Sequence, residues 1–216
     1  MSSNNIQLGK NGKLGQIDLS KLRAGVKKED LIKNNSELAS IFDKYDVNVQ
    51  DGVLDHQEIE TLKADLLQLV GDDNELSEKE AKAFVGQNGQ TIGRKGRKNL
   101  YEFYNNLAEM TANVKSVETK EVGGQQVEFV TYDDGHKEEL YPDGTKIVEV
   151  MQGNKKIRTT KDDKNKILSE VVVENEGEEN EITSTTEFEN GARKTTTIVN
   201  KGDNTTTTIN YEIISG

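Results

Sequence analysis

Side chains that carry oxygen gather in residues 46–58, which read DVNVQDGVLDHQE around a single glycine, Gly52. Carboxylate and amide oxygens are the hard ligands that calcium prefers, and a calcium loop also needs a sharp turn and a carboxylate that can bind through both oxygens. Gly52 could supply the turn and Glu58 the final carboxylate. The spacing therefore predicts a calcium site within this stretch. The other oxygen-bearing side chains in it are Asp46, Asn48, Gln50, Asp51 and Asp55.

The stretch resembles the calcium loop of EF-hand proteins of bacterial type, whose pattern is D-x-[DN]-x-[DN]-G-x5-E. With Gly52 at the glycine position, the second half of the loop fits, whereas Asp46 and Asn48 lie one residue too far from the glycine. One residue is therefore inserted within residues 47–50. The resemblance covers residues 36–86. It implies a calcium ligand set of Asp46, Asn48, Asp51 or Gln50, the Val53 carbonyl, Asp55 and Glu58.

The same residues allow a second interpretation that needs no metal. Asp51 and Gly52 form a turn signal, and Asp55 followed three residues later by Glu58 matches a capping box, the side-chain arrangement that starts a helix. A capping box does not account for Asp46 at the beginning of the stretch. Both interpretations stay open at this point.

A second, weaker copy of the loop follows at an offset of 22 residues. DNELSEKE at residues 73–80 aligns with DGVLDHQE at residues 51–58, and Asn74 takes the glycine position. Ser77 with Glu80 also fits a capping box, so a weak metal site and a helix start are both compatible with this copy. The layout is similar to the duplicated segments of calcium loop and helix in dockerins. The candidate ligands of the second site are Asp72, Asp73, Ser77 and Glu80.

Helices are expected on both sides of these loops. Apolar residues recur at three- and four-residue spacing in residues 29–45, after each loop, and in residues 98–113, which predicts amphipathic helices there. Residues 1–17 are mostly polar and predict a flexible tail. The expectation for residues 18–113 is therefore an all-helical, EF-hand-like domain.

From residue 114 onward, short runs alternate between apolar and polar residues. Pairs such as Asp134-Gly135 and Asp143-Gly144 separate the runs and favour tight hairpins between antiparallel strands. YDDGHKEEL and YPDGTKIVE are near-copies, similar to short hairpin repeats of bacterial surface and toxin-associated proteins. The predicted fold class is α+β: the helical EF-hand-like domain, followed over residues 114–216 by an antiparallel β-meander of short hairpin repeats.

The chain of 216 residues carries a net charge of −11 and contains no cysteine. The charge argues against nucleic acid as a partner, because phosphates would repel it. We expect neither a signal peptide nor membrane insertion, because no apolar run is long enough. Motifs of catalytic sites are missing from the sequence, so a non-enzymatic protein is expected.

Two functions are compatible with these patterns. The first is a non-enzymatic calcium-binding protein, in which Ca2+ orders the helical domain and the β-meander is an interaction surface or spacer for an unknown protein partner. The alternative is a structural, adhesin-like or virion-associated interaction protein whose EF-hand-like loops do not bind metal. The compartment is unknown; secretion by a non-classical route and association with a virion are both compatible with the sequence.

Overall fold

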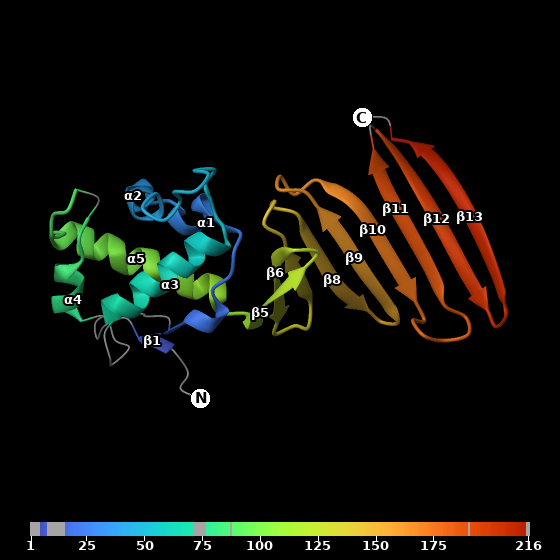
Figure 1. Ribbon diagram of the computed structural model, residues 1–216, viewed down its shortest axis with the longest axis horizontal. Helices are drawn as coiled ribbons and strands as arrows, with labels where there is room; N and C mark the ends of the chain where they lie inside the picture. Colours follow the sequence, from blue (N-terminus) through green and yellow to red (C-terminus); the bar gives the residue numbers. More distant parts are fainter. Residues whose placement is uncertain (1–4, 8–15, 71–76, 87, 190, 215–216) are drawn as a thin grey trace. The chain divides into compact units, whose positions relative to one another are not determined.

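The computed structural model of the chain describes residues 5–7, 16–70, 77–86, 88–189 and 191–214. The chain divides into two compact units, Met1–Val117 and Glu118–Gly216. Figure 1 shows helices in the first unit and a long antiparallel sheet in the second.

Two long amphipathic helices supply nine of the nineteen buried apolar residues that form the core of the first unit. In α3 the buried residues Ile59, Leu62 and Leu66 follow three- and four-residue spacing, and in α5 Phe103 and Leu107 do the same. These side chains belong to one cluster of fully buried apolar residues. The described helices are α1 (Lys28–Ile32), α2 (Ala39–Phe42), α3 (His56–Val70), α4 (Glu78–Ala83) and α5 (Arg94–Thr111).

Two small antiparallel sheets complete the first unit. β1 (Asn5–Gln7) pairs with β2 (Gln16–Asp18), and β3 (Val26–Lys27) pairs with β4 (Val53–Leu54). Ile17 in β2 is fully buried in the core. The described residues of the range predicted as a flexible tail are therefore paired strands.

The predicted all-helical domain over residues 18–113 is wrong, because short helices alternate with strands there. The expected continuous helix over residues 29–45 ends at Lys33, which has a positive φ of 45°. Asn35 then caps a new 3₁₀ turn, since its side chain accepts a hydrogen bond of 3.2 Å from the Glu37 N–H. Asparagine competes for backbone groups in this way, and it therefore divides a helix that apolar spacing alone predicts as continuous.

The large sheet, most of which belongs to the second unit, contains nine strands in sequence order, all antiparallel where the register is described. This order is compatible with the predicted β-meander. The strands are β5 (Val114–Val122), β6 (Gln125–Tyr132), β7 (Lys137–Leu140), β8 (Lys146–Gln152), β9 (Lys155–Lys161), β10 (Ile167–Glu174), β11 (Ile182–Glu189), β12 (Ala192–Lys201) and β13 (Asn204–Ile213).

Burial differs sharply along this sheet. Among the described residues, no side chain of β8 to β13 is buried, and every residue of β13 is exposed. The sheet is therefore a single layer over these strands, with both faces reached by solvent. The buried residues of Glu118–Gly216 lie on β6 and β7: Val127, Glu128, Val130, Glu138 and Leu140.

Candidate functional site

The oxygen-rich loop of residues 46–58 is fixed to the core at both ends. Tyr45 before it and Ile59 after it are almost fully buried, and Leu54 within it is fully buried. The loop also pairs with β3, with Leu54 opposite Val26, and the Lys28 N–H donates a hydrogen bond of 2.8 Å to the Gly52 carbonyl. The backbone of the loop is thus held by packing and by a short sheet.

The inserted residue is accommodated by two left-handed backbone positions. Gln50 has a φ of 54° and Gly52 a φ of 81°. Glycine adopts such values at no steric cost, whereas glutamine does so rarely. With these two positions the longer loop still brings the Gly52 N–H to Asp46 Oδ2, at 3.0 Å.

Glu58 acts as a clamp on the loop. Its Oε1 atom accepts hydrogen bonds from the N–H groups of Val47 (2.7 Å) and Asn48 (2.8 Å), and its Oε2 atom accepts one from Asp55 (2.9 Å). The Glu58 N–H in turn donates to Asp55 Oδ1 at 2.9 Å, which completes a capping box. With 3% of its surface exposed, Glu58 joins the two ends of the loop through backbone amides.

Asp46 is the one residue of the loop with an unsatisfied buried oxygen among the described residues. Its Oδ2 atom accepts a hydrogen bond of 3.0 Å from the Gly52 N–H, whereas Oδ1 is buried without a partner. Only 5% of the residue is exposed. Burial raises the pKa of this carboxyl, the Gly52 hydrogen bond opposes that shift, and the negative charges of Glu58 and Asp51 add to it. A buried carboxylate oxygen without a hydrogen-bond partner calls for an explanation, such as a bound water or an ion.

The remaining candidate ligands differ in their hydrogen bonds and in their exposure to solvent. The Asn48 amide donates a hydrogen bond of 2.9 Å to Asp55 Oδ2, so these two side chains hold each other. Asp51 is exposed, and its Oδ1 atom accepts from the Val53 N–H at 2.9 Å. Gln50 is exposed at its left-handed position.

The Val53 carbonyl points away from β3. The carbonyls on either side of it, those of Gly52 and Leu54, accept hydrogen bonds from Lys28 and Gly25 on the β3 side. Successive carbonyls of an extended segment point in opposite directions, so the Val53 carbonyl points away from β3. It therefore remains a candidate cation ligand.

Within the described residues, no group of three or more acidic, histidine or cysteine side chains is close enough to hold a metal ion. Two oxygens of the loop remain candidate ligands: the buried Asp46 Oδ1, which has no hydrogen-bond partner, and the Val53 carbonyl, with the exposed Asp51 carboxylate in the same turn. Glu58 fits less well than its position in the pattern predicts, because both of its oxygens are already bound to amides.

The second predicted site is described only in part. Asp72 and Asp73 lie outside the described residues. Ser77 and Glu80 form a capping box at the start of α4, with hydrogen bonds of 2.7 Å from Ser77 N–H to Glu80 Oε2 and 3.2 Å from Glu80 N–H to Ser77 Oγ.

The segment that pairs with the first loop is Val26–Lys27, which lies upstream of it. A strand of two residues gives no periodic signal, so the sequence did not reveal this pairing.

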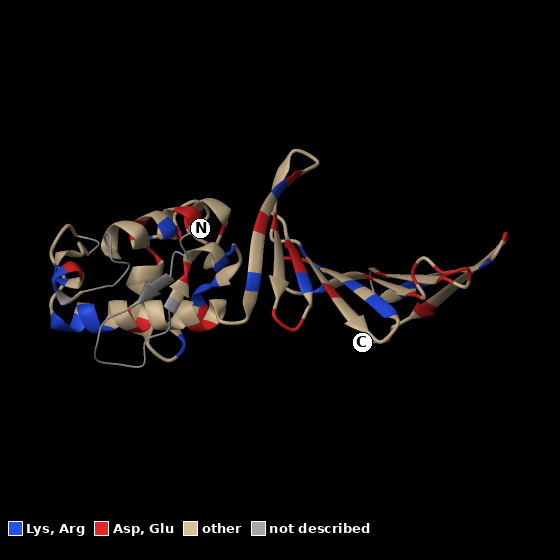
Figure 2. Ribbon diagram, turned by 90° about the horizontal axis from the view of Figure 1, so that it is seen from below, with Lys and Arg blue, Asp and Glu red and all other residues tan. Residues whose placement is uncertain are grey.

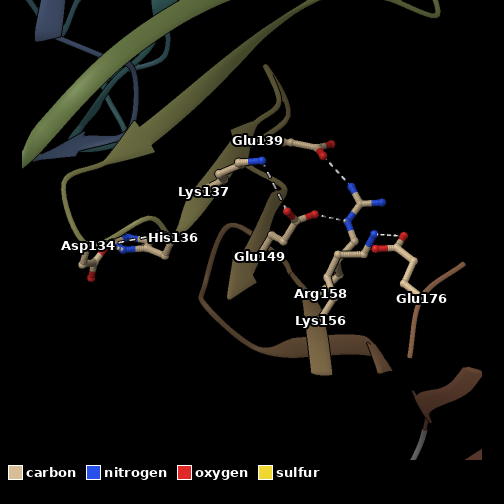
Figure 3. A network of polar contacts seen from close by, with 8 residues as sticks. All are labelled: Asp134, His136, Lys137, Glu139, Glu149, Lys156, Arg158 and Glu176. Atoms are coloured by element: carbon tan, nitrogen blue, oxygen red, sulfur yellow. Dashed lines mark hydrogen bonds and ion pairs between the residues drawn. The ribbon is translucent and has the colours of Figure 1, made fainter. Parts of the chain in front are cut away.

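A row of opposite charges crosses the second unit on neighbouring strands (Figure 3). Arg158 on β9 lies between Glu139 and Glu149, with its Nε atom 3.6 Å from Glu149 Oε2 and an ion pair to Glu139. Lys137 on β7 approaches Glu149 on β8 at 3.7 Å. Opposite charges on adjacent strands favour one register, so this row serves to align the strands.

His136, one of the two histidines of the chain, lies at the turn between β6 and β7. Its Nδ1 atom is 2.5 Å from Asp134 Oδ1 and its ring stacks on Tyr132. Hydrogen bonds from the His136 backbone and ring lower the pKa of the Asp134 carboxyl. These contacts stabilise the hairpin turn.

Comparisons of the chain with protein-family models, with curated proteins and with solved structures give no match. Among the described residues, no helix has both the length and the apolar character needed to cross a membrane.

Proposed function

We propose that residues 46–58 bind one calcium ion and that the chain is a non-enzymatic calcium-binding protein whose sheet serves as an interaction surface. The observation that carries the proposal is the buried Asp46 carboxylate, whose Oδ1 atom has no partner. Burying a carboxylate is costly unless a hydrogen bond, a positive charge or a metal ion compensates it. Among the described residues Oδ1 has no hydrogen-bond partner, and a bound cation would supply the compensation that the protein does not.

The loop would provide three oxygen ligands for such an ion. They are a carboxylate oxygen of Asp46, the Val53 carbonyl and, from the solvent side, a carboxylate oxygen of Asp51. A bound Ca2+ supplies positive charge and draws six to eight oxygens, so water would complete the shell. Because Glu58 is engaged by amides, the site has fewer charged ligands than the EF-hand pattern implies. We therefore expect weak binding, with a dissociation constant of about 10⁻⁴ M or weaker.

The second candidate function is an interaction protein whose loop binds no metal. The clamp formed by Glu58 favours it, because three amide hydrogen bonds account for the burial of Glu58 without an ion. In that case Asp46 would serve only as an acceptor for the Gly52 N–H. The two functions therefore differ in the role of a single oxygen, Asp46 Oδ1.

The test compares thermal unfolding of the wild type and of Asp46→Asn, each with chelator and with calcium. At free calcium about 100-fold above the dissociation constant, binding adds about 2.7 kcal/mol to the free energy of unfolding. For a unit of this size that corresponds to a rise in Tm of roughly 10 °C. We expect this rise in the wild type and none in Asp46→Asn. Asp30→Asn, the same change at an exposed position of α1, should keep the full rise.

The measurement in chelator separates the two functions further. If Oδ1 is a ligand position, removing the buried charge should leave the Tm of Asp46→Asn in chelator unchanged or higher than that of the wild type. A wild-type Tm that does not respond to calcium, or an equal response in Asp46→Asn, would refute the calcium site and favour the interaction protein.

A further inference from the structure

The strand β13 forms one edge of the nine-stranded sheet, with β12 as its sole neighbour among the described strands. All ten of its residues are exposed. Three large apolar side chains are among them: Ile209 is 51% exposed, Tyr211 75% and Ile213 87%. They alternate along the strand and therefore share one face of the sheet with Thr205 and Thr207.

The same five residues direct their backbone groups to the free edge. The Ile214 N–H donates to the Gly191 carbonyl at 2.6 Å, so even-numbered positions point toward β12. Because an antiparallel ladder alternates, the N–H and C=O groups of the odd-numbered residues from Thr205 to Ile213 point outward. The register between β12 and β13 is continuous from Ala192–Ile213 to Lys201–Asn204, so no bulge interrupts this row.

The two edges of the sheet differ in charge, and Figure 2 shows blue and red segments alternating along β5. β5, at the other edge, carries Lys115, Glu118, Lys120 and Glu121, and lysines and glutamates of this kind protect an edge from pairing with another chain. β13 carries only Glu212, and Arg193 on β12 already binds it at 2.7 Å. It contains no proline either. An edge of this length without such protection is a template for strand addition.

We propose that β13 is the interface for a second copy of this chain, whose β13 adds antiparallel to it. The proposal rests on the sheet as an interaction surface, as stated above, and not on calcium. Antiparallel pairing about Ile209 would set Ile209 opposite its own copy, Thr207 opposite Tyr211, and Thr205 opposite Ile213. Pairs of β-branched and aromatic residues are those that stabilise sheets. All of them would lie on the same face in both copies.

The charge on β13 selects the antiparallel arrangement. In that pairing Glu212 lies opposite Thr206 of the other copy, whereas a parallel pairing would set the two glutamates side by side. On the same face, Thr208 would lie opposite Asn210 of the other copy, so hydroxyl and amide groups would also meet across the new strand pair. Since the β5 edge is charged, the assembly would stop at two copies.

The test places charges at Ile209, the position that would meet its own copy. The full chain is studied in chelator by sedimentation velocity over a range of concentrations, so that the result does not depend on the calcium site. We expect the wild type to pass from one chain to two as concentration rises. Ile209→Lys and Ile209→Glu alone should each weaken association by about tenfold or more, because like charges then face each other.

Mixing the two variants in equal amounts should restore association, because lysine then faces glutamate. Val122→Lys, a lysine added to an exposed apolar position of β5, should associate like the wild type. Circular dichroism of each variant verifies that the sheet is formed. A wild type that stays a single chain, variants that associate as well as the wild type, or a mixture that stays dissociated would each overturn the proposal.

Discussion

Replacing Glu58 by glutamine removes the clamp of the loop without changing its shape. The carboxylate accepts hydrogen bonds from the N–H groups of Val47, Asn48 and Asp55. Glutamine has one acceptor oxygen, so its NH₂ group must face an N–H on one side or the other. At least one backbone amide of this part-buried loop then loses its acceptor, and the hydrogen bonds that remain lose the charge on the acceptor.

The loss follows from the strength of hydrogen bonds to charged groups. Each contributes about 1.5–3 kcal/mol, and losing one while the others weaken should lower the free energy of unfolding by about 2–3 kcal/mol. For a unit the size of Met1–Val117, 1 kcal/mol shifts the Tm by roughly 4 °C, so Glu58→Gln should lower it by about 8–12 °C. The helical circular dichroism signal, followed on heating in chelator, measures this shift.

Glu60→Gln is the matched control. It makes the same change two residues further along α3, where the side chain is 53% exposed and pairs with Lys63 at 2.7 Å. Exposed pairs of this kind contribute little, about 0.5 kcal/mol or less. If Glu58→Gln melts within about 1 °C of Glu60→Gln, the three amide hydrogen bonds do not stabilise the loop and the clamp interpretation fails.

Two further predictions concern the core of the first unit and the turns of the second. Burial raises the pKa of the hydroxyls of Tyr45 and Tyr104, so the stability that they contribute is complete below the unfolded pKa near 10 and declines as pH rises above it. Absorbance at 295 nm should show these two tyrosines ionising only together with the loss of helical circular dichroism; ionisation in a still-folded protein would contradict this. Gly144→Ala should destabilise more than Gly135→Ala in urea: both glycines have a positive φ, but an added Cβ at Gly144 would lie 2.7 Å from Asp163 Cβ, whereas Gly135 faces open space. We expect a difference of about 1 kcal/mol, and equal urea midpoints would refute it.

The turns of the sheet were the part of the fold most accessible from the sequence. Asp-Gly and Gly-Asn pairs mark where the chain reverses, and Asp134-Gly135, Asp143-Gly144 and Gly153-Asn154 each lie between two consecutive strands. A tight turn depends on a few residues that tolerate special backbone angles, so its signal is local. Apolar spacing is also a local signal, and the long amphipathic helices α3 and α5 could therefore be predicted from it.

The first unit could not be predicted in the same way, because its strands are two or three residues long. Such strands exist only through pairing with distant segments, as Val26 pairs with Leu54. Apolar spacing also hides a break: residues 29–45 keep their helical pattern across Lys33, although the backbone leaves the helix there. The bounds of these elements depend on tertiary pairing and on side-chain caps, and neither produces a periodic pattern of apolar residues in the sequence.

At the candidate site, the sequence indicated which residues lie in the loop but not what each one binds. The pattern treats Glu58 as a metal ligand, whereas its carboxylate meets three backbone amides. The direction of an amide depends on the backbone path, which the extra residue alters through Gln50. The orphaned oxygen of Asp46 is likewise a property of packing, since burial and the single Gly52 hydrogen bond together create it.

The single layer formed by β8 to β13 has a consequence for how this unit comes apart. Each of these strands is hydrogen-bonded only to its neighbours in the sequence, and none contributes a buried side chain to a shared core. Stability is then close to a sum over adjacent pairs, as in repeat proteins, rather than a property of the whole. The contacts are also local in sequence, which favours fast formation of one hairpin after another. We therefore expect such a sheet to yield to force or denaturant by stages, strand after strand from the β13 edge, while β6 and β7 remain folded.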